Sequence, residues 1–588
     1  MQQNHTALLD TIPAPPTATP VSFTLNGTTV VCRSDETILE AAQQNGVEIP
    51  RLCYMEGMRP DGNCRTCMVE IKGERVLAPS CCRYPKEGME VTSNSARALT
   101  SQKMSIELLL SDIPETSYTL NSELDFWARK LSIGKPRFAA RQQPVEDLSH
   151  PAMAVHLDAC IQCNRCVRAC REEQVNDVIG YAFRGGQSKI VFDLDDAMGE
   201  STCVACGECI QACPTGALMP ARDVGKVVPD KQVDSVCPYC GVGCQLTYNI
   251  QNNTILYVQG KDGPANSSRL CVKGRYGFDY VQHKHRLTKP LIRKPGIPKT
   301  KDFVVDPENW REVFREATWE EALEFAAKGF REARDTHGKR SLAGFGSAKC
   351  TNEEAYVFQK LVRTGFGSNN VDHCTRLCHA SSVAALMEGI NSGAVSNQVR
   401  DVANAEVIFL IGANPTVNHP VAATFIKNAA KSGVKLIVAD PRRGDLARHA
   451  TYNLQFKADT DVALLNAMLH VIVEEDLVDK AFVRDRTSGY EALAENVKKF
   501  SPELMAPICG IDAQTIREVA RLYATSKASI ILWGMGISQH VHGTDNARCL
   551  IALALSTGQI GKPGSGLHPL RGQNNVQGAS DAGLIPMF

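Results

Sequence analysis

The sequence CIQCNRCVRAC occupies residues 160–170, and CVACGECIQACP occupies residues 203–214. Both runs space their cysteines as C-x2-C-x2-C-x3-C, and the second ends in a proline. Runs of this kind hold two [4Fe–4S] clusters, and the fourth cysteine of each run binds the cluster of the other run. The predicted ligands are Cys160, Cys163, Cys166 and Cys213 for one cluster, and Cys203, Cys206, Cys209 and Cys170 for its neighbour.

The composition shows the kind of protein that holds these runs. The chain has 588 residues, of which 43% are hydrophobic, and this length predicts several globular domains. Sixty-four basic residues balance 64 acidic ones without a long basic tract, so we expect no nucleic-acid partner. No apolar run reaches the roughly 18–20 residues that span a bilayer, and the N-terminal sequence has neither a signal-peptide core nor a twin-arginine pair. We expect a cytoplasmic protein without a membrane partner, whose 23 cysteines are metal-bound or buried thiols.

Another cysteine group lies in CYMEGMRPDGNCRTCMVEIKGERVLAPSC at residues 53–81. Before it, the alternating apolar residues of VSFTLNGTTVVC and the helical pattern of ETILEAAQQNG predict a small β-rich ferredoxin domain. Gly62 lets backbone N–H groups approach the sulfurs of a [2Fe–2S] cluster. Cys82 competes with Cys81 for the fourth ligand position, and a zinc site is the alternative. The predicted ligands are Cys53, Cys64, Cys67 and Cys81.

A third group lies in CPYCGVGC at residues 237–244 and RLCVKGRYG at residues 269–277. Its four cysteines are Cys237, Cys240, Cys244 and Cys271. This short–short–long spacing suits a [4Fe–4S] cluster and a zinc ribbon equally well. The cysteines outside the three regions are Cys32, Cys82, Cys350, Cys374, Cys378, Cys509 and Cys549. Most of them are expected to be buried structural thiols.

The segment AEVIFLIGANPTVNHPVAATFIKNAAKSGVKLIVADPRRGDLARHA at residues 405–450 has the pattern strand, loop, helix, strand. Because ligands bind outside the carboxyl ends of parallel strands, the two loops of this βαβ unit should converge on a nucleotide. The loop residues concerned are Gly412, Asn414, Asn418, Asp440 and Arg442.

Two further stretches carry candidate active-site residues. VDHCTRLCHASSVAAL at residues 371–386 places Cys374 and Cys378 four residues apart with His379 beside the second, although two core thiols on a helix would give the same pattern. GQIGKPGSGLHPLRGQNNVQGASDAG at residues 558–583 surrounds Arg571 with Gly, Asn and Gln. Such an irregular loop has many free donors and suits anionic ligands, and a plain surface loop is the alternative.

Together these motifs resemble the catalytic subunit of cytoplasmic NAD-linked formate dehydrogenases, which are molybdenum or tungsten bis-pterin enzymes of the DMSO reductase superfamily. The first cysteine group is also similar to the ferredoxin domain at the front of complex I's large iron–sulfur subunit, and this likeness implies Cys81 as the fourth ligand. The third group is similar to the N-terminal [4Fe–4S] domain of the pterin enzymes, which implies a cluster there. Lys273 would lie between that cluster and the pterin, although a solvated surface lysine is the alternative.

The same resemblance implies roles around the metal. Cys378 would bind the pterin metal, Arg571 would hold the formate carboxylate, and Cys374 would only pack. A soft thiolate suits such a metal, and we expect the neighbouring imidazole of His379 to titrate near neutral pH and handle a proton. A histidine after the ligand cysteine favours formate over nitrate as substrate. Guanosine contacts are implied for the βαβ loop residues and for Asp459, Asp461, Met535 and Gln539.

The implied cofactors are one [2Fe–2S] cluster, three [4Fe–4S] clusters and a bis(molybdopterin guanine dinucleotide) centre with molybdenum or tungsten. The implied reaction is oxidation of formate to CO2, or its reverse, with electrons passing through the clusters to an iron–sulfur partner that carries flavin and NAD. A nitrate or other oxoanion reductase is one alternative, and a non-catalytic electron-relay subunit is another.

The predicted fold class is multidomain α+β and α/β: a [2Fe–2S] ferredoxin domain, a two-cluster ferredoxin domain and the N-terminal domains of a bis-pterin oxidoreductase. Because the family's subunits continue beyond the arginine loop, we expect the family's C-terminal part to be absent from this chain. The predicted segments are a disordered tail (1–20), the [2Fe–2S] domain (21–100), a helical connector (101–150), the two-cluster domain (151–230), the third cluster domain (231–290), part of a split α/β domain (291–373) and a dinucleotide domain (374–588).

Overall fold

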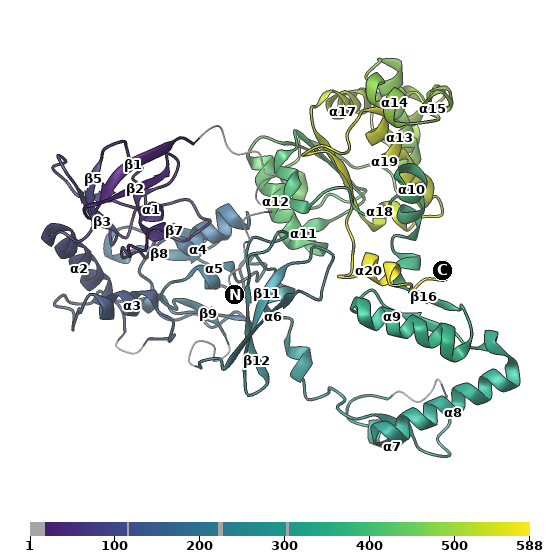
Figure 1. Cartoon of the computed structure of the whole chain (residues 1–588), viewed down its shortest axis with the longest axis horizontal. Coiled ribbons are helices and arrows are strands. Elements are labelled where there is room, and N and C mark those ends of the chain that lie inside the picture. The colour runs from purple at the N-terminus through teal and green to yellow at the C-terminus, as the bar shows by residue number, and fades with distance from the viewer. Residues whose placement is uncertain (1–17, 115–116, 222–226, 301–304, 588) are drawn as a thin grey trace. The chain divides into compact units, whose positions relative to one another are not determined.

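The computed structural model describes residues 18–114, 117–221, 227–300 and 305–587 (Figure 1). The predicted disordered tail lies outside the described residues as far as residue 17. The chain divides into two compact units, Met1–Pro229 and Asp230–Phe588, and each is described by itself. The finer domain boundaries given by the sequence stay predictions.

The first unit begins with a five-stranded mixed sheet in the order β2-β1-β5-β3-β4. Alternation in the first two strands buries Phe23, Leu25 and Val30 in a core against helix α1 (Ile38–Gln44). The Thr37 hydroxyl accepts the Glu40 N–H, and the Glu40 carboxylate accepts the Thr37 N–H, so a capping box starts this helix where the sequence predicts it. The strands are β1 (Pro20–Leu25), β2 (Thr28–Arg33), β3 (Met68–Ile71), β4 (Ala78–Pro79) and β5 (Glu90–Thr92).

Helices then join this sheet to the two-cluster region. Helices α2 (Ala96–Leu110) and α3 (Glu123–Lys130) begin at the capping hydroxyls of Ser95 and Ser122. The cysteine runs lie around two short helices, α4 (Arg165–Arg168) and α5 (Glu208–Ala212). Two antiparallel pairs complete the unit: β6 (Met153–Val155) with β9 (Leu218–Pro220), and β7 (Ile179–Ala182) with β8 (Lys189–Phe192).

The second unit starts with an antiparallel sheet in the order β10-β11-β12. Its strands are β10 (Lys231–Val236), β11 (Gln245–Gln251) and β12 (Thr254–Gly260), and helix α6 (Val272–Tyr276) begins directly after Cys271. The third cysteine group therefore lies on the turn between β10 and β11 and at the start of α6.

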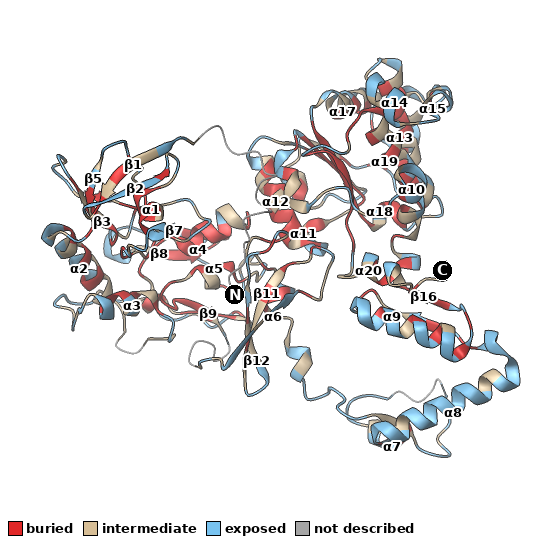
Figure 2. Cartoon of the chain, viewed as in Figure 1, coloured by how far each residue is buried: buried red, intermediate tan, exposed pale blue. Residues whose placement is uncertain are grey.

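The next segment contains small paired strands and an exposed helix. Strand β13 (Leu291–Arg293) pairs with β14 (Phe314–Glu316), and β15 (Gly344–Gly346) pairs with β16 (Val371–His373). The helices are α7 (Trp310–Val313), α8 (Trp319–His337) and α9 (Asn352–Lys360). Helix α8 has no buried residue, and Trp319, Leu323 and Phe325 on it are exposed (Figure 2).

A five-stranded parallel sheet in the order β19-β18-β17-β20-β21 forms the centre of the second unit. Its strands are β17 (Val407–Ile411), β18 (Lys435–Ala439), β19 (Tyr452–Leu454), β20 (Ser529–Trp533) and β21 (Gly566–Pro569). Figure 2 shows most of this sheet as buried, because apolar clusters cover both faces. The predicted βαβ unit is confirmed as β17, helix α12 (Pro420–Lys431) and β18.

The remaining helices of this unit are α10 (Ala380–Ile390), α11 (Pro415–Asn418), α13 (Asp461–Glu474), α14 (Lys480–Arg486), α15 (Tyr490–Val497), α16 (Pro502–Cys509), α17 (Ala513–Thr525), α18 (Met535–Ser538), α19 (Gly543–Ser556) and α20 (Val576–Asp581). The chain runs from β17 to β18 and β19 on one side, then returns to β20 and β21 on the other. The strand order therefore reverses between β17 and β20, and this switch point is where doubly wound sheets bind ligands. Among the described residues, no helix is long and apolar enough to span a bilayer.

Candidate functional site

The four thiols predicted to bind the [2Fe–2S] cluster lie together. The Cys53 N–H donates to Cys64 Sγ at 3.4 Å, and hydrogen bonds with the Cys64 and Cys81 thiols lower the pKa of Cys53. The Cys81 thiol is also hydrogen-bonded to the Cys67 thiol, and both residues are buried. Cys82 is exposed, so the geometry favours Cys81 as the fourth ligand.

In the two-cluster region, the fourth cysteine of each run lies near cysteines of the other run, as the spacing predicts. Cys160, Cys163 and Cys166 of the first run line one small cavity with Cys213 of the second. Burial raises the pKa of Cys163, and the neighbouring Cys213 raises it further. Cys170 of the first run lies near Cys203 of the second, where burial and then Cys170 raise the pKa of Cys203. Within the described parts of the chain, no three His, Cys, Asp or Glu side chains form a site for a single metal ion.

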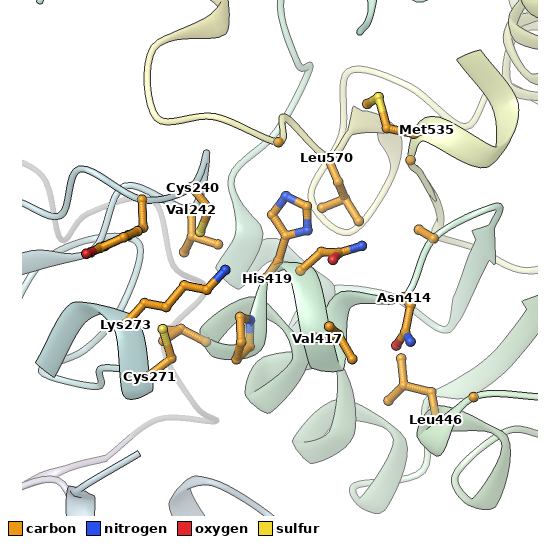
Figure 3. Close-up of a pocket in the computed structure, with 18 of the residues that line it drawn as sticks. Cys240, Val242, Cys271, Lys273, Asn414, Val417, His419, Leu446, Met535 and Leu570 are labelled. Atoms are coloured by element: carbon orange, nitrogen blue, oxygen red, sulfur yellow. The ribbon is translucent and has the colours of Figure 1, made fainter. Parts of the chain in front are cut away.

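A cavity of about 560 Å³ in the second unit is the main candidate site. Lys273 extends into it beside Cys271, and Asn414 and Met535 lie across it (Figure 3). The cavity therefore connects the third cysteine group with the switch point of the parallel sheet. The site residues predicted from the sequence that line this cavity are Cys237, Cys240, Cys244, Cys271, Lys273, Gly412, Asn414, Asn418, Asp440, Arg442 and Met535.

The walls at the switch point are built for close backbone approach. Gly412 has a φ of +58°, and a Cβ there would lie 2.8 Å from the backbone carbon of Gly536. Beyond β18, the Arg442 N–H donates to Asp440 Oδ1 at 2.8 Å, which holds that carboxylate at the strand end. Open space outside the carboxyl ends of β17, β18 and β20 matches the shape that an elongated nucleotide requires.

Three of the predicted nucleotide contacts lie outside the lining of this cavity. Asp459 pairs with His540 at 3.0 Å, and the Gln539 amide donates to the Leu377 carbonyl. Asp461 is only 2% exposed, and its Oδ1 has no hydrogen-bond partner among the described residues. A buried acceptor without a partner fits the N–H edge of a guanine, which would satisfy it.

Asp461 also gives a prediction for pH dependence. Burial raises its pKa to about 6, so the folded state binds the proton more tightly than the unfolded state does. The stability of the cofactor-free protein should therefore fall as the pH rises from about 4 to about 6. Asp461→Asn should remove this loss, and its stabilising effect should grow over that window to at most about 3 kcal/mol.

The measurement is the free energy of unfolding of the cofactor-free protein between pH 4 and pH 7.5. Asp459→Asn is the matched control, because the side chain of Asp459 is 63% exposed. A stabilising effect of Asp461→Asn that does not change with pH would show that burial of the charge is not its cause.

Cys378 lies at the end of a 3-10 helix (Cys374–Leu377), just before α10. Its Sγ is 3.5 Å from Met535 Sδ, burial raises its pKa, and the Gly572 N–H and Arg571 oppose that rise. The fold thus brings this thiol beside the arginine loop. Cys374, in contrast, donates to Gln573 Oε1 at 2.6 Å and accepts the Ala348 N–H at 3.3 Å, as a packing thiol would.

Arg571 is a buried cation with unused donors. Its Nη2 donates to the Gly393 carbonyl at 2.6 Å, whereas Nε and Nη1 are buried without a partner among the described residues. Burial lowers its pKa to about 10, which leaves it charged at neutral pH. Nε and Nη1 lie on opposite sides of the guanidinium and each shares an edge with Nη2, so the two oxygens of a carboxylate can accept from one unused donor and from the second N–H of Nη2.

The arginine loop is tied to the third cysteine group through its backbone. The Arg571 carbonyl accepts the Gly241 N–H at 3.1 Å and His419 Nε2 at 2.7 Å. A Cβ on Gly241 would lie 2.4 Å from that carbonyl, so only glycine fits in this turn of CPYCGVGC. The loop between Cys240 and Cys244 and the predicted substrate-binding loop are therefore packed together.

For His379, the predicted titration near neutral pH is wrong in this structure. The imidazole is fully buried, and burial followed by the charge of Arg571 lowers its pKa to about 3. Its Nε2–H donates to the Leu570 carbonyl at 2.9 Å, and its Nδ1 accepts from Ser538 at 3.2 Å. His379 is therefore a neutral ring whose Nδ1 is an acceptor.

The chain also matches models of known protein families. A family model described as molybdopterin oxidoreductase matches residues 286–585. The chain belongs to the molybdopterin oxidoreductase family. Further models match a 2Fe–2S iron–sulfur cluster binding domain at residues 18–96, a 4Fe–4S dicluster domain at 159–217 and a molybdopterin oxidoreductase Fe4S4 domain at 230–283. These matches confirm the predicted fold class.

Curated relatives of this molybdopterin oxidoreductase cover almost the whole chain. Probable oxidoreductase YjgC of Bacillus subtilis is 33% identical over 96% of this chain and 60% of its own length. Putative formate dehydrogenase SH0748 of Staphylococcus haemolyticus is 32% identical over 96% and 60%. This chain thus spans about 60% of the length of these relatives.

A solved structure shares the fold of this molybdopterin oxidoreductase. Acetylene hydratase from Pelobacter acetylenicus aligns with a TM-score of 0.50 at 24% identity, over 57% of this chain and 44% of that one. The likeness shows the architecture alone.

Two buried histidines of this molybdopterin oxidoreductase were not predicted from the sequence. His419 and His568 line a second cavity of about 410 Å³ together with Arg571. Burial lowers the pKa of both, that of His568 to about 4. His568 lies three residues before Arg571, and this spacing was the available signal, but His419 lies about 150 residues away and had none.

Proposed function

We propose that this protein oxidises formate to CO2 at a molybdenum or tungsten centre held by two molybdopterin guanine dinucleotides. The observation that carries the proposal is Arg571, a buried cation with two unpaired N–H donors beside the Cys378 thiol. The names of SH0748 and similar relatives support formate as the substrate. In the proposal the reaction runs in the cytoplasm and can operate in either direction.

The proposed mechanism begins with binding of the carboxylate. Formate accepts hydrogen bonds from one of the unused donors of Arg571 and from the second N–H of Nη2, whose first N–H stays fixed to the Gly393 carbonyl, so the anion is held in one orientation. Burial of the guanidinium excludes water, which strengthens this charge-assisted pair. In this orientation the C–H bond of formate would point away from the arginine and toward Cys378.

Loss of two electrons and one proton converts formate to CO2. When bound, the pterin metal supplies the two-electron redox chemistry, and Cys378 would be its protein ligand. His379 is neutral and its Nδ1 accepts from the Ser538 hydroxyl, so a proton from formate would reach the ring through that hydroxyl. The negative charge of bound formate offsets Arg571, which removes one of the two main causes of the lowered pKa of His379.

We further propose where the nucleotide and the electrons go. The 560 Å³ cavity would hold one pterin guanine dinucleotide between Lys273 and the switch point, and the guanine would extend beyond the cavity lining to Asp461, which would accept from it. Contacts of Asp459 and Gln539 with the nucleotide belong to the same proposal. One-electron clusters would then carry the electrons from the third cysteine group through the first unit to an iron–sulfur partner with flavin and NAD.

The test is formate-dependent reduction of a viologen dye by the purified complex, with molybdenum, tungsten, iron and guanine nucleotide measured in the same sample. We expect dye reduction with formate, one molybdenum or tungsten atom per chain and no nitrate-dependent oxidation of reduced dye. Activity with nitrate alone would identify an oxoanion reductase. Iron and sulfide without molybdenum, tungsten or guanine would identify an electron-relay protein.

A further inference from the structure

The loops that carry the [2Fe–2S] ligands and the first [4Fe–4S] ligands contact each other inside the first unit. Leu52 and Cys53 share one buried apolar cluster with Ile161 and Cys163. Polar contacts extend this interface: Asn63 Nδ2 donates to the Gln162 carbonyl at 3.2 Å, and Asn164 Nδ2 donates to Asp61 Oδ2 at 2.8 Å. Residues about a hundred positions apart therefore join two predicted cluster sites.

Two arginines of α4 cross this interface from either side of Cys166. Arg165 Nη1 donates to the Leu52 carbonyl at 3.2 Å, and its charge is paired with Glu123 at 2.9 Å. Arg168 reaches the same ligand loop through different atoms: Nη1 donates to the Arg59 carbonyl and Nη2 to the Cys53 carbonyl.

Arg168 differs from Arg165 in what balances its charge. It is only 2% exposed, its Nε is buried without a partner, and within the described chain no carboxylate pairs with it. A buried guanidinium stays protonated and is costly unless a negative charge lies near. The carboxylates around Arg59, those of Asp61 and Glu172, are already paired with the Arg59 side chain. The hydrogen bond from Arg168 to the Cys53 carbonyl makes the thiolate of that predicted ligand a counter-charge for Arg168.

Four thiolates give each iron–sulfur cluster a net negative charge, which rises further when the cluster is reduced. A fixed cation in a site of low dielectric constant therefore stabilises the reduced form and makes the reduction potential less negative. Because Arg168 extends from the first [4Fe–4S] loop to the carbonyl of the predicted [2Fe–2S] ligand Cys53, its charge would act on both clusters.

We propose that Arg168 is a positioning residue and shared counter-charge that holds the [2Fe–2S] loop against the first [4Fe–4S] loop and sets the potentials of both clusters. The inference rests on the proposed clusters but not on formate as the substrate. In this inference an electron passes between the two clusters across the contact of these two loops.

The test is a redox titration of the purified holoprotein with dithionite, followed by electron paramagnetic resonance of the two clusters. We expect Arg168→Gln to shift both midpoint potentials to more negative values. Arg168→Lys keeps the charge and should shift them less. Arg59→Gln is the matched control, since it makes the same charge change close by on a side chain that is 61% exposed and pairs with Glu172 at 3.0 Å.

Unchanged potentials in Arg168→Gln, with iron content at the parental level, would overturn the proposal. If Arg168→Gln fails to retain iron, Arg168→Lys decides: recovery of iron with near-parental potentials supports the counter-charge, and no recovery overturns it in favour of the hydrogen bonds alone. Because dithionite supplies the electrons, a protein without formate activity gives the same readout, and failure of the proposed function is distinguished from failure of this inference.

Discussion

Replacing Cys378 with alanine is expected to abolish formate-dependent dye reduction while the iron content stays near the parental value. The thiol lies beside Met535 and the arginine loop, and none of the three cysteine groups with predicted clusters includes it. Loss of a metal ligand should lower the activity by several orders of magnitude, because no other described thiol lies in that position. The measurement is activity together with iron, molybdenum and tungsten per chain.

Cys374→Ala is the matched control for this experiment. That thiol is four residues away but is already bonded to Gln573 and Ala348, so its loss should leave the activity within several-fold of the parental value. If Cys378→Ala lost iron in proportion to activity, the thiol would belong to a cluster and the proposed site would be wrong. Equal loss of activity in both variants would point to packing of the loop as the common cause.

Arg571→Lys is expected to raise the formate concentration needed for half-maximal rate by about 10–100-fold. Lysine keeps a positive charge but loses the planar pair of donors, and a charge-assisted hydrogen bond is worth about 1.5–3 kcal/mol. Since about 1.4 kcal/mol corresponds to tenfold in affinity, this range gives the expected factor. Steady-state kinetics with formate and a dye measure it.

Arg548→Lys serves as the control, because Arg548 is half-exposed and pairs with Glu388 on the surface of the same unit. It should change neither the maximal rate nor the formate dependence. An unchanged half-saturating formate concentration in Arg571→Lys would show that the two unpaired donors of Arg571 do not hold the substrate.

The cysteine groups could be recognised in the sequence because the spacing typical of cluster ligands is local, while the assignment of each ligand stays a prediction. The exchange of the fourth cysteine between the two runs was also predictable, and the structure brings Cys213 to the first run. The choice between Cys81 and Cys82 depended on burial, which two adjacent residues of the same type cannot reveal. The convergence of the loops after β17 and β18 could be predicted because ligands bind outside the carboxyl ends of parallel strands, and both loops line one cavity.

Properties that depend on distant contacts could not be predicted. The pKa of His379 is lowered by burial against Leu570 and Ser538, residues that lie more than 150 positions further along the chain. The position of His419 under the Arg571 carbonyl depends on the same packing. A histidine next to a predicted ligand has many environments open to it, and only the fold decides whether it meets water or a carbonyl.

The parallel pairing of β17 with β20 has a consequence for the order in which this protein matures. Val407 lies opposite Ser529, and β18, β19 and helices α11 to α17 are synthesised between them. Until the ribosome has released Trp533 and the residues just after it, the cavity lacks the wall formed by Gly534, Met535 and Gly536. Pairing over so long a loop is slow, because the entropy of closing the loop must be lost before the strand contacts form. We therefore expect a pterin nucleotide to enter only after translation of this sheet is complete, when the chain has folded around an empty site.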